Sequence, residues 1–155
     1  MSFRFKGIPR APFEALFALD DAALAERDIS RVIADEKPGF PCRVSLADAE
    51  VGERVLLLAY PHQPAHSPFK ASGPIFVREN ARETFDRVGE LPEVLKNRLL
   101  SIRAYDAAGM MVDADVAEGA GVEPLIKKFL ARADTDYLHV HFARRGCFSC
   151  RVERG

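Results

Sequence analysis

The residues best suited to chemistry lie near the C-terminus, where two of the four histidines and two of the three cysteines stand close together. Leu138, Val140 and Phe142 alternate with His139 and His141, which is the period of a half-buried strand. Both imidazoles therefore project from the same face of that strand. Such a pair can hold a metal ion, although it is also common in ordinary sheets.

A turn after this strand predicts a β-hairpin. Gly146 indicates a three-residue loop that ends in a left-handed glycine. This register pairs His139 with Arg151 and His141 with Ser149, and it sets Leu138, Val140 and Phe142 across from Val152, Cys150 and Phe148. The polar face then carries His139, His141, Cys147, Ser149, Arg151 and Glu153. Because the two cysteines point to opposite faces, a Cys-x-x-Cys zinc knuckle is disfavoured.

One hypothesis is that this polar face binds a small anionic or polar molecule. Its candidate residues are His139, His141, Ser149, Arg151, Arg43, Arg103 and Tyr105. A guanidinium binds carboxylate or phosphate through two parallel hydrogen bonds, and the proline-rich loop from His62 to Pro74 would close over the ligand. The competing interpretation makes Arg103 a cross-strand ion-pair partner of Asp113 and Tyr105 a packing aromatic.

A second hypothesis is a mononuclear zinc or iron site with hydrolase-type chemistry. His139 and His141 would be ligands, and the third would come from His62, His66 or Cys147. Three convergent histidine or cysteine side chains would favour metal, whereas convergent arginines would favour an anion. The sequence requires no cofactor and leaves open whether the protein is an enzyme, and a third hypothesis is a structural or interaction module without catalysis.

Composition excludes several other classes of function. The 155 residues are 48% hydrophobic, which fits one compact domain spanning residues 1–155. With 22 basic and 23 acidic residues, the chain gives no electrostatic reason to expect nucleic acid or an anionic membrane as partner. No apolar run approaches membrane-spanning length. Three cysteines argue against a secreted disulfide framework, so we expect a cytoplasmic protein; its oligomeric state is left open.

Hydrophobic periodicity predicts an α+β fold. The clearest elements are a strand at 3–6, a central strand at 54–60, a hairpin with strands at 100–105 and 111–116, and an amphipathic helix at 122–133. Asn80 and Glu83 resemble a capping box that would start a short helix. We expect a largely antiparallel sheet with helices packed on it, in either a sandwich-like arrangement or a partly closed barrel.

Several motifs, read in order, resemble a bacterial family known only as domain of unknown function 1203. They are Pro41-Cys42-Arg43, Ser72-Gly73-Pro74-Ile75-Phe76, Arg103-Ala104-Tyr105-Asp106, His139-Val140-His141 and Gly146-Cys147-Phe148. The resemblance covers nearly the whole chain and implies a small stand-alone bacterial protein. It implies no activity, cofactor or catalytic residue, so the roles above depend on the chemistry of the residues alone.

Overall fold

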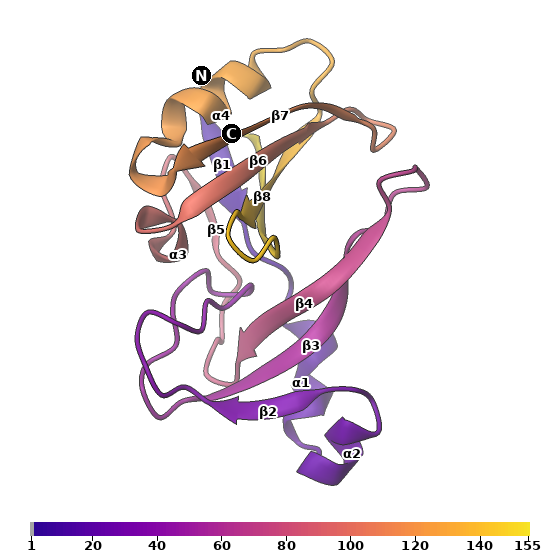
Figure 1. The fold of residues 1–155 in the computed structure, drawn as a ribbon, viewed down its shortest axis with the longest axis vertical. Coiled ribbons are helices and arrows are strands. Elements are labelled where there is room, and N and C mark those ends of the chain that lie inside the picture. The colour runs from indigo at the N-terminus through magenta and orange to yellow at the C-terminus, as the bar shows by residue number, and fades with distance from the viewer. Residues whose placement is uncertain (1) are drawn as a thin grey trace.

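The chain folds into two antiparallel sheets, and the computed structural model describes residues 2–155 (Figure 1). The larger sheet has the strand order β5-β1-β9-β8-β6-β7. Its strands are β1 (Phe3–Lys6), β5 (Asp86–Val88), β6 (Leu99–Tyr105), β7 (Met111–Glu118), β8 (Tyr137–Phe142) and β9 (Phe148–Arg154). The smaller sheet has the order β2-β3-β4, formed by β2 (Ser30–Ile33), β3 (Arg54–Gln63) and β4 (Ala71–Arg78). The α+β prediction is confirmed, and neither sheet closes into a barrel.

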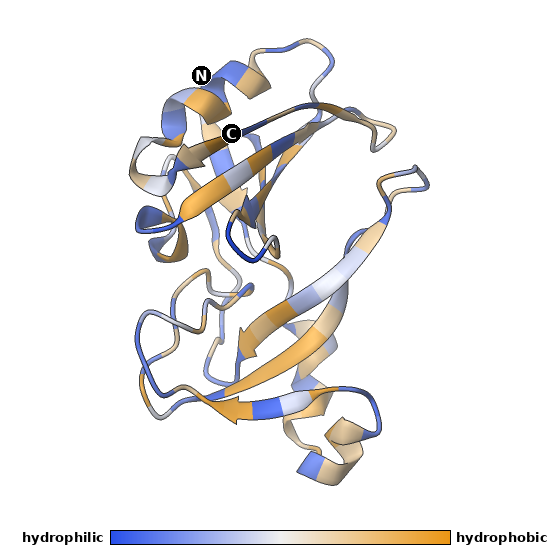
Figure 2. Cartoon of the chain, in the orientation of Figure 1, coloured by the Kyte–Doolittle hydropathy of each residue, from blue (hydrophilic) through white to orange (hydrophobic). Residues whose placement is uncertain are grey.

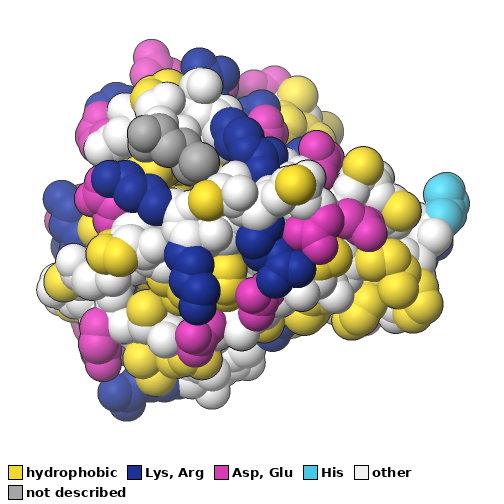
Figure 3. All heavy atoms as spheres, turned by 90° about the horizontal axis from the view of Figure 1, so that it is seen from above, with side chains coloured by type: hydrophobic (Ala, Val, Ile, Leu, Met, Phe, Trp, Pro, Cys, Tyr) yellow, Lys and Arg dark blue, Asp and Glu magenta, His cyan; other side chains and the backbone are white. Residues whose placement is uncertain are grey.

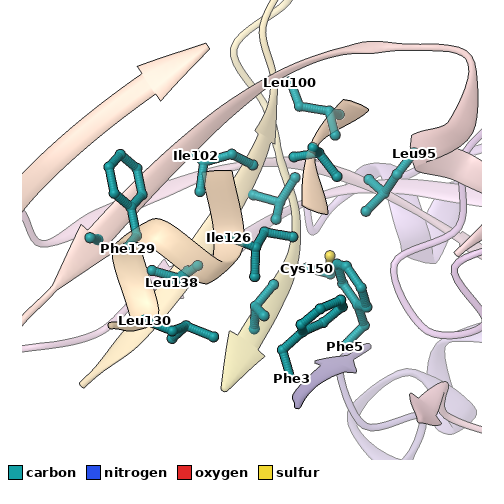
Figure 4. Close-up of a cluster of buried hydrophobic side chains, with 14 of the residues drawn as sticks. Phe3, Phe5, Leu95, Leu100, Ile102, Ile126, Phe129, Leu130, Leu138 and Cys150 are labelled. Atoms are coloured by element: carbon teal, nitrogen blue, oxygen red, sulfur yellow. The ribbon is translucent and has the colours of Figure 1, made fainter. Parts of the chain in front are cut away.

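The first hydrophobic core lies between one face of the larger sheet and helix α4 (Glu123–Leu130). Leu138, Val140 and Cys150 are fully buried in it, as the alternation along β8 and β9 predicts. Figure 4 shows Ile126 and Phe129 of α4 directed into the same cluster. Burying one such side chain contributes about 1.5–3 kcal/mol. The predicted helix is therefore confirmed, although it is shorter than the periodic stretch. Helix α3 (Glu93–Lys96) and the 3-10 turn η1 (Gly119–Gly121) adjoin this core.

The second core belongs to the smaller sheet. Strand β3 lies between β2 and β4, so the prediction of a central strand is confirmed. Helices α1 (Ala11–Phe17) and α2 (Asp21–Ala25) contribute Phe13 and Leu24 to this core. The side chain of Asp20 accepts a hydrogen bond from the backbone N–H of Ala23 and so caps α2. In Figure 2, β3 and β4 are hydrophobic where they pair near β2 and more hydrophilic toward their connecting loop.

The hydrophilic ends of β3 and β4 reach across to the larger sheet. β3 continues through Pro61 and His62 to Gln63, and β4 already begins at Ala71. The loop predicted from His62 to Pro74 is therefore shorter than expected, because residues at both of its ends belong to strands β3 and β4. A register shift between Tyr60 and Gln63 explains why β3 tolerates a proline there, since bulges relieve the need for a backbone N–H.

Two other local predictions are corrected by the structure. Residues around Asn80 form turns rather than a helix, and the chain then enters β5. In the β6–β7 hairpin Tyr105 lies opposite Met111, and an irregularity beside Ala104 shifts the remaining pairs by one residue from the register that would pair Arg103 with Asp113. Arg103 therefore lies opposite Ala114 instead of Asp113, and Asp113 pairs with Arg132 at 2.8 Å.

Charge is distributed evenly on the face of the molecule drawn in Figure 3. Basic and acidic side chains alternate there without a large field of one sign, in agreement with the near-zero net charge. Within residues 2–155 no helix is long and apolar enough to cross a membrane.

Candidate functional site

Three histidines meet in the layer between the two sheets. His139 and His141 come from β8, and His62 comes from the far end of β3. Each can offer one ring nitrogen so that the three atoms lie within 4.8 Å of one another. His139 and His141 are only 3% and 2% exposed, and His62 is half-buried. The fold thus gathers one of the metal-ligand sets that the sequence suggested, with His62 as the third member.

The β8–β9 hairpin orients this cluster in a way that differs in part from the prediction. The pairs Leu138–Val152, His139–Arg151 and Val140–Cys150 are as predicted, and Gly146 has the left-handed φ of 81°. However, the loop spans residues 143–146, and His141 pairs with Phe148 because of a bulge at Ser149. The Phe148 ring therefore lies among the histidines instead of in the first core, and it stacks on His62 with a centroid distance of 5.3 Å.

Hydrogen bonding fixes the protonation of one histidine. The distance from Nδ1 of His141 to the carbonyl oxygen of Gly146 is 2.9 Å, and because a carbonyl only accepts, Nδ1 carries the proton. Nε2 of His141 consequently keeps a lone pair, and Nη1 of Arg103 lies 3.4 Å from it. Nδ1 of His62 and Nδ1 of His139 are buried without a hydrogen-bond partner in the described residues. A buried polar atom without a partner costs about 1–3 kcal/mol.

Burial keeps the cluster neutral. Desolvation, assisted by the neighbouring His141 and Arg151, lowers the pKa of His139 to about 3. Desolvation also lowers the pKa of His141 to about 4, although its bond to Gly146 acts in the opposite direction. The pKa of His62 is lowered by desolvation and by the charge of Arg103. Neutral imidazoles are the form that binds metal ions, so proton competition at pH 7 is weak.

A pocket of about 640 Å³ opens beside the cluster. Its walls include His62, His139, Tyr60, Ile8 and Phe148, and Arg151 stands among the residues that line it. No aspartate or glutamate of the described chain lines it. The wall is therefore largely apolar and aromatic, and the charged side chains that the described residues contribute to it are cationic. This is the usual composition of a small-molecule site with a few oriented polar groups.

Sequence reasoning missed the residues that support this pocket. Nε2 of Gln63 donates a hydrogen bond to the hydroxyl of Tyr137 at 3.0 Å, and both side chains are buried. Tyr137 also lies beneath the guanidinium of Arg151, 4.0 Å from its ring centroid. No local pattern marks these residues, because their contact joins strands of different sheets and depends on the β3–β4 ribbon reaching the larger sheet.

Arg103, Tyr105 and Arg151 surround the histidines. Arg103 on β6 and Arg151 on β9 both lie directly across from His139 in the sheet register. The Tyr105 ring is buried and approaches the His139 ring with a centroid distance of 5.0 Å, and its desolvation raises the pKa of its hydroxyl. This contact is the one expected of a packing aromatic, and the role of Tyr105 as a ligand-binding residue stays a prediction.

The other predicted candidates lie elsewhere. Arg43 is 2% exposed and donates hydrogen bonds to the carbonyls of Pro41 and Phe148 and to Sγ of Cys147. These bonds hold the hairpin loop, so Arg43 acts as an internal support rather than as a ligand of the histidine pocket. Cys147 lies beside Arg43 and outside the cluster, and His66 is exposed in the β3–β4 loop. Ser149 is fully buried at the bulge.

The cluster fits a divalent transition-metal ion. A zinc–nitrogen distance of about 2.1 Å places tetrahedral ligand nitrogens about 3.4 Å apart, so the three rings need to close by little more than about 1 Å. The bond from Nδ1 of His141 to Gly146 fixes the ring in the orientation that metal-ligating histidines adopt, with Nε2 available. Three protein ligands leave a fourth coordination position free, which is the arrangement of catalytic rather than structural zinc sites.

The comparisons with known proteins give a family without an assigned role. No curated protein and no solved structure matches this chain significantly. A family model described as "Protein of unknown function (DUF1203)" matches residues 39–154, a span that contains all three histidines of the cluster. The chain therefore belongs to the DUF1203 family.

Proposed function

We propose that this protein binds one divalent transition-metal ion, zinc or iron(II), through His62, His139 and His141. The observation that carries the proposal is the convergence of three neutral imidazoles, two of which have a buried Nδ1 without a partner. Burial of such atoms is costly unless another group completes their coordination.

The proposed chemistry is metal-assisted attack of water on a small molecule in the adjacent pocket. A metal ion with an open position lowers the pKa of its bound water toward 7 and so provides hydroxide at neutral pH. Within residues 2–155 no carboxylate lines the pocket to act as a general base, so the metal itself would have to generate the nucleophile. Hydrolysis or hydration of a small substrate is the reaction class that this arrangement supports best.

The intracellular setting is part of the same proposal. All three cysteines are free, with Cys42 and Cys150 buried and Cys147 partly exposed. Reduced thiols are typical of the cytoplasm, where iron(II) is also maintained. We therefore propose a cytoplasmic location.

Elemental mass spectrometry on untagged protein purified without chelators tests the metal site. We expect about one equivalent of zinc or iron in the wild type, and its loss in a His139→Ala/His141→Ala double variant and in His62→Ala. His66→Ala is the matched control, because His66 is an exposed histidine of the same strand connection and lies outside the cluster. Wild-type protein that contains no metal and takes up none from added zinc, cobalt(II) or iron(II) would overturn the proposal.

A further inference from the structure

Three polar side chains form one row across the larger sheet. Lys6 on β1 lies directly opposite Arg151 on β9, and Arg151 lies directly opposite His139 on β8. Residues that are directly opposite in an antiparallel sheet project from the same face, and neighbouring strands are about 5 Å apart. All three side chains line the pocket beside the histidine cluster. The row therefore places two cations in that pocket, one and two strands away from a proposed metal ligand.

The side chain of Arg151 is held in place by two neighbours. Its guanidinium carbon lies 4.0 Å from the centroid of the Tyr137 ring, and its Nε lies 3.0 Å from a carboxylate oxygen of Glu153. Within residues 2–155 its two terminal nitrogens form no hydrogen bond. These two nitrogens carry the parallel N–H donors that match the two oxygens of a carboxylate. Arg151 is thus a preoriented guanidinium in the wall of the pocket.

This end of the pocket carries a net positive charge. Glu153 also lies 3.5 Å from Nζ of Lys6, so a single carboxylate is shared by two cations. Glu153 itself does not line the pocket, and neither does any other acidic side chain of residues 2–155. A cleft whose charges have one sign attracts ligands of the opposite sign. Two cations and one carboxylate leave one positive charge, which a singly charged anion matches better than a doubly charged phosphate.

The remaining wall of the pocket is suited to an apolar group. Ile8 and Pro9, which follow β1, line it together with Tyr60 and Phe148. Aromatic and aliphatic side chains of this kind remove an apolar ligand body from water, while a few polar groups fix its orientation. The pocket therefore combines a cationic row at one place with an apolar surface beside it.

We propose that Arg151, assisted by Lys6, binds a carboxylate of the substrate. The inference rests on the proposed function, because the metal-bound water would attack a different group of the same molecule. The open position of the metal ion stays with that water, and the carboxylate lies one strand away from His139. The carboxylate and the reacting group are therefore only a few bonds apart. The substrate class is a small carboxylic acid with an apolar body and a separate group that water can attack.

Titration of 3-phenylpropionate and of the neutral 3-phenylpropionamide into ¹⁵N-labelled protein tests this inference by NMR. The two molecules have the same apolar body and differ in charge. Each titration is made at low ionic strength, because the Arg151 side chain is 41% exposed and salt screens it. Each is made both without metal and with one equivalent of zinc, so that carboxylate binding is measured separately from the metal site. We expect saturable shifts of the backbone amides around Lys6 and Arg151 with the carboxylate under both conditions.

Two variants identify the residue that binds the carboxylate. Arg151→Gln should weaken 3-phenylpropionate binding by about tenfold, because charge-assisted hydrogen bonds are lost. Arg103→Gln is the matched control, with an expected change of less than about twofold, because Arg103 lies opposite His139 on the other side and does not line the pocket. The NMR spectrum of each variant shows directly whether the fold is retained.

The outcomes separate this inference from the metal site. Equal affinity of the wild type for the acid and the amide would overturn the carboxylate, whatever the variants do. Equal affinity of wild type and Arg151→Gln for the acid would overturn the role of Arg151. Binding of the acid by a protein that takes up no zinc would support the carboxylate site and overturn the metal site alone. Zinc uptake without binding of the acid would overturn the carboxylate site alone.

Discussion

Acidification of the metal-free protein should weaken the fold through His139 and His141. In the folded state the pKa of His139 is lowered to about 3 and that of His141 to about 4, mainly by desolvation, whereas an unfolded histidine titrates near 6.5. Between about pH 6.5 and 4 the unfolded chain therefore binds more protons than the folded chain. Stability is fully present above about pH 6.5 and falls as the pH decreases toward the folded-state values.

The expected size of the effect follows from the two shifts. Each histidine changes the free energy of unfolding by about 1.4 kcal/mol per pH unit inside this window. Between pH 7.5 and pH 5 each contributes a loss of about 2 kcal/mol, so the pair costs about 4 kcal/mol, a large share of the stability of a typical domain. The ion pair with Arg78 lowers the pKa of Glu53, so the contribution of this carboxylate is lost only at more acidic pH.

Urea unfolding followed by far-UV circular dichroism, in the presence of a chelator at pH 7.5, 6 and 5, measures this dependence. His139→Phe should remove about half of it, because phenylalanine fills the aromatic layer without taking up a proton. His66→Ala is the matched control, because this exposed histidine lies outside the cluster. Equal stability at pH 7.5 and pH 5 in wild type, or an unaltered slope in His139→Phe, would refute the assignment of neutral buried imidazoles.

Three further substitutions test the packing that positions the site, each by urea unfolding. Arg43→Met should destabilise by about 2–4 kcal/mol, because it removes the three hydrogen bonds of a buried guanidinium; a loss below about 0.5 kcal/mol would contradict its role as internal support. Gly119→Ala should cost at least about 2 kcal/mol, since the new Cβ would lie 1.6 Å from the carbonyl oxygen of Leu95, whereas Gly121→Ala meets open space; equal effects of the two would refute this. Leu138→Ala should cost about 2–5 kcal/mol through a cavity beneath α4, and a neutral result would mean that the core relaxes fully.

The core face of the C-terminal hairpin could be predicted because alternation is a local signal. Leu138, Val140 and Cys150 face α4 as their spacing indicates. The prediction placed Phe148 on the core face of the hairpin, and the structure places it on the opposite face. A bulge adds one residue that no sequence pattern reveals. In addition, the alternation rule assigns every apolar side chain to the core. Both faces of the sheet are covered here, so an aromatic ring is equally well buried in the layer that contains His62.

The third histidine could be named but not positioned from the sequence. Pro61 and Pro64 on either side of His62 are typical of a loop, yet the bulge in β3 accommodates the first proline within a strand. The distance in sequence between His62 and His139 means that only the packing of the two sheets brings them together. The same packing removes His66 from the cluster, although both histidines lie in one proline-rich segment of the sequence.

The histidine layer also contains features that lower the stability of the fold. His62, His139 and His141 occupy positions in an aromatic layer that phenylalanine could fill without buried unpartnered nitrogens, and Phe148 in fact packs against all three. Beside them, the half-buried guanidinium of Arg103 forms no ion pair within residues 2–155. A purely structural layer has no use for either feature. Proteins tolerate such costs mainly at functional sites, where a ligand offsets them, and the proposed metal ion would be such a ligand for the three imidazoles.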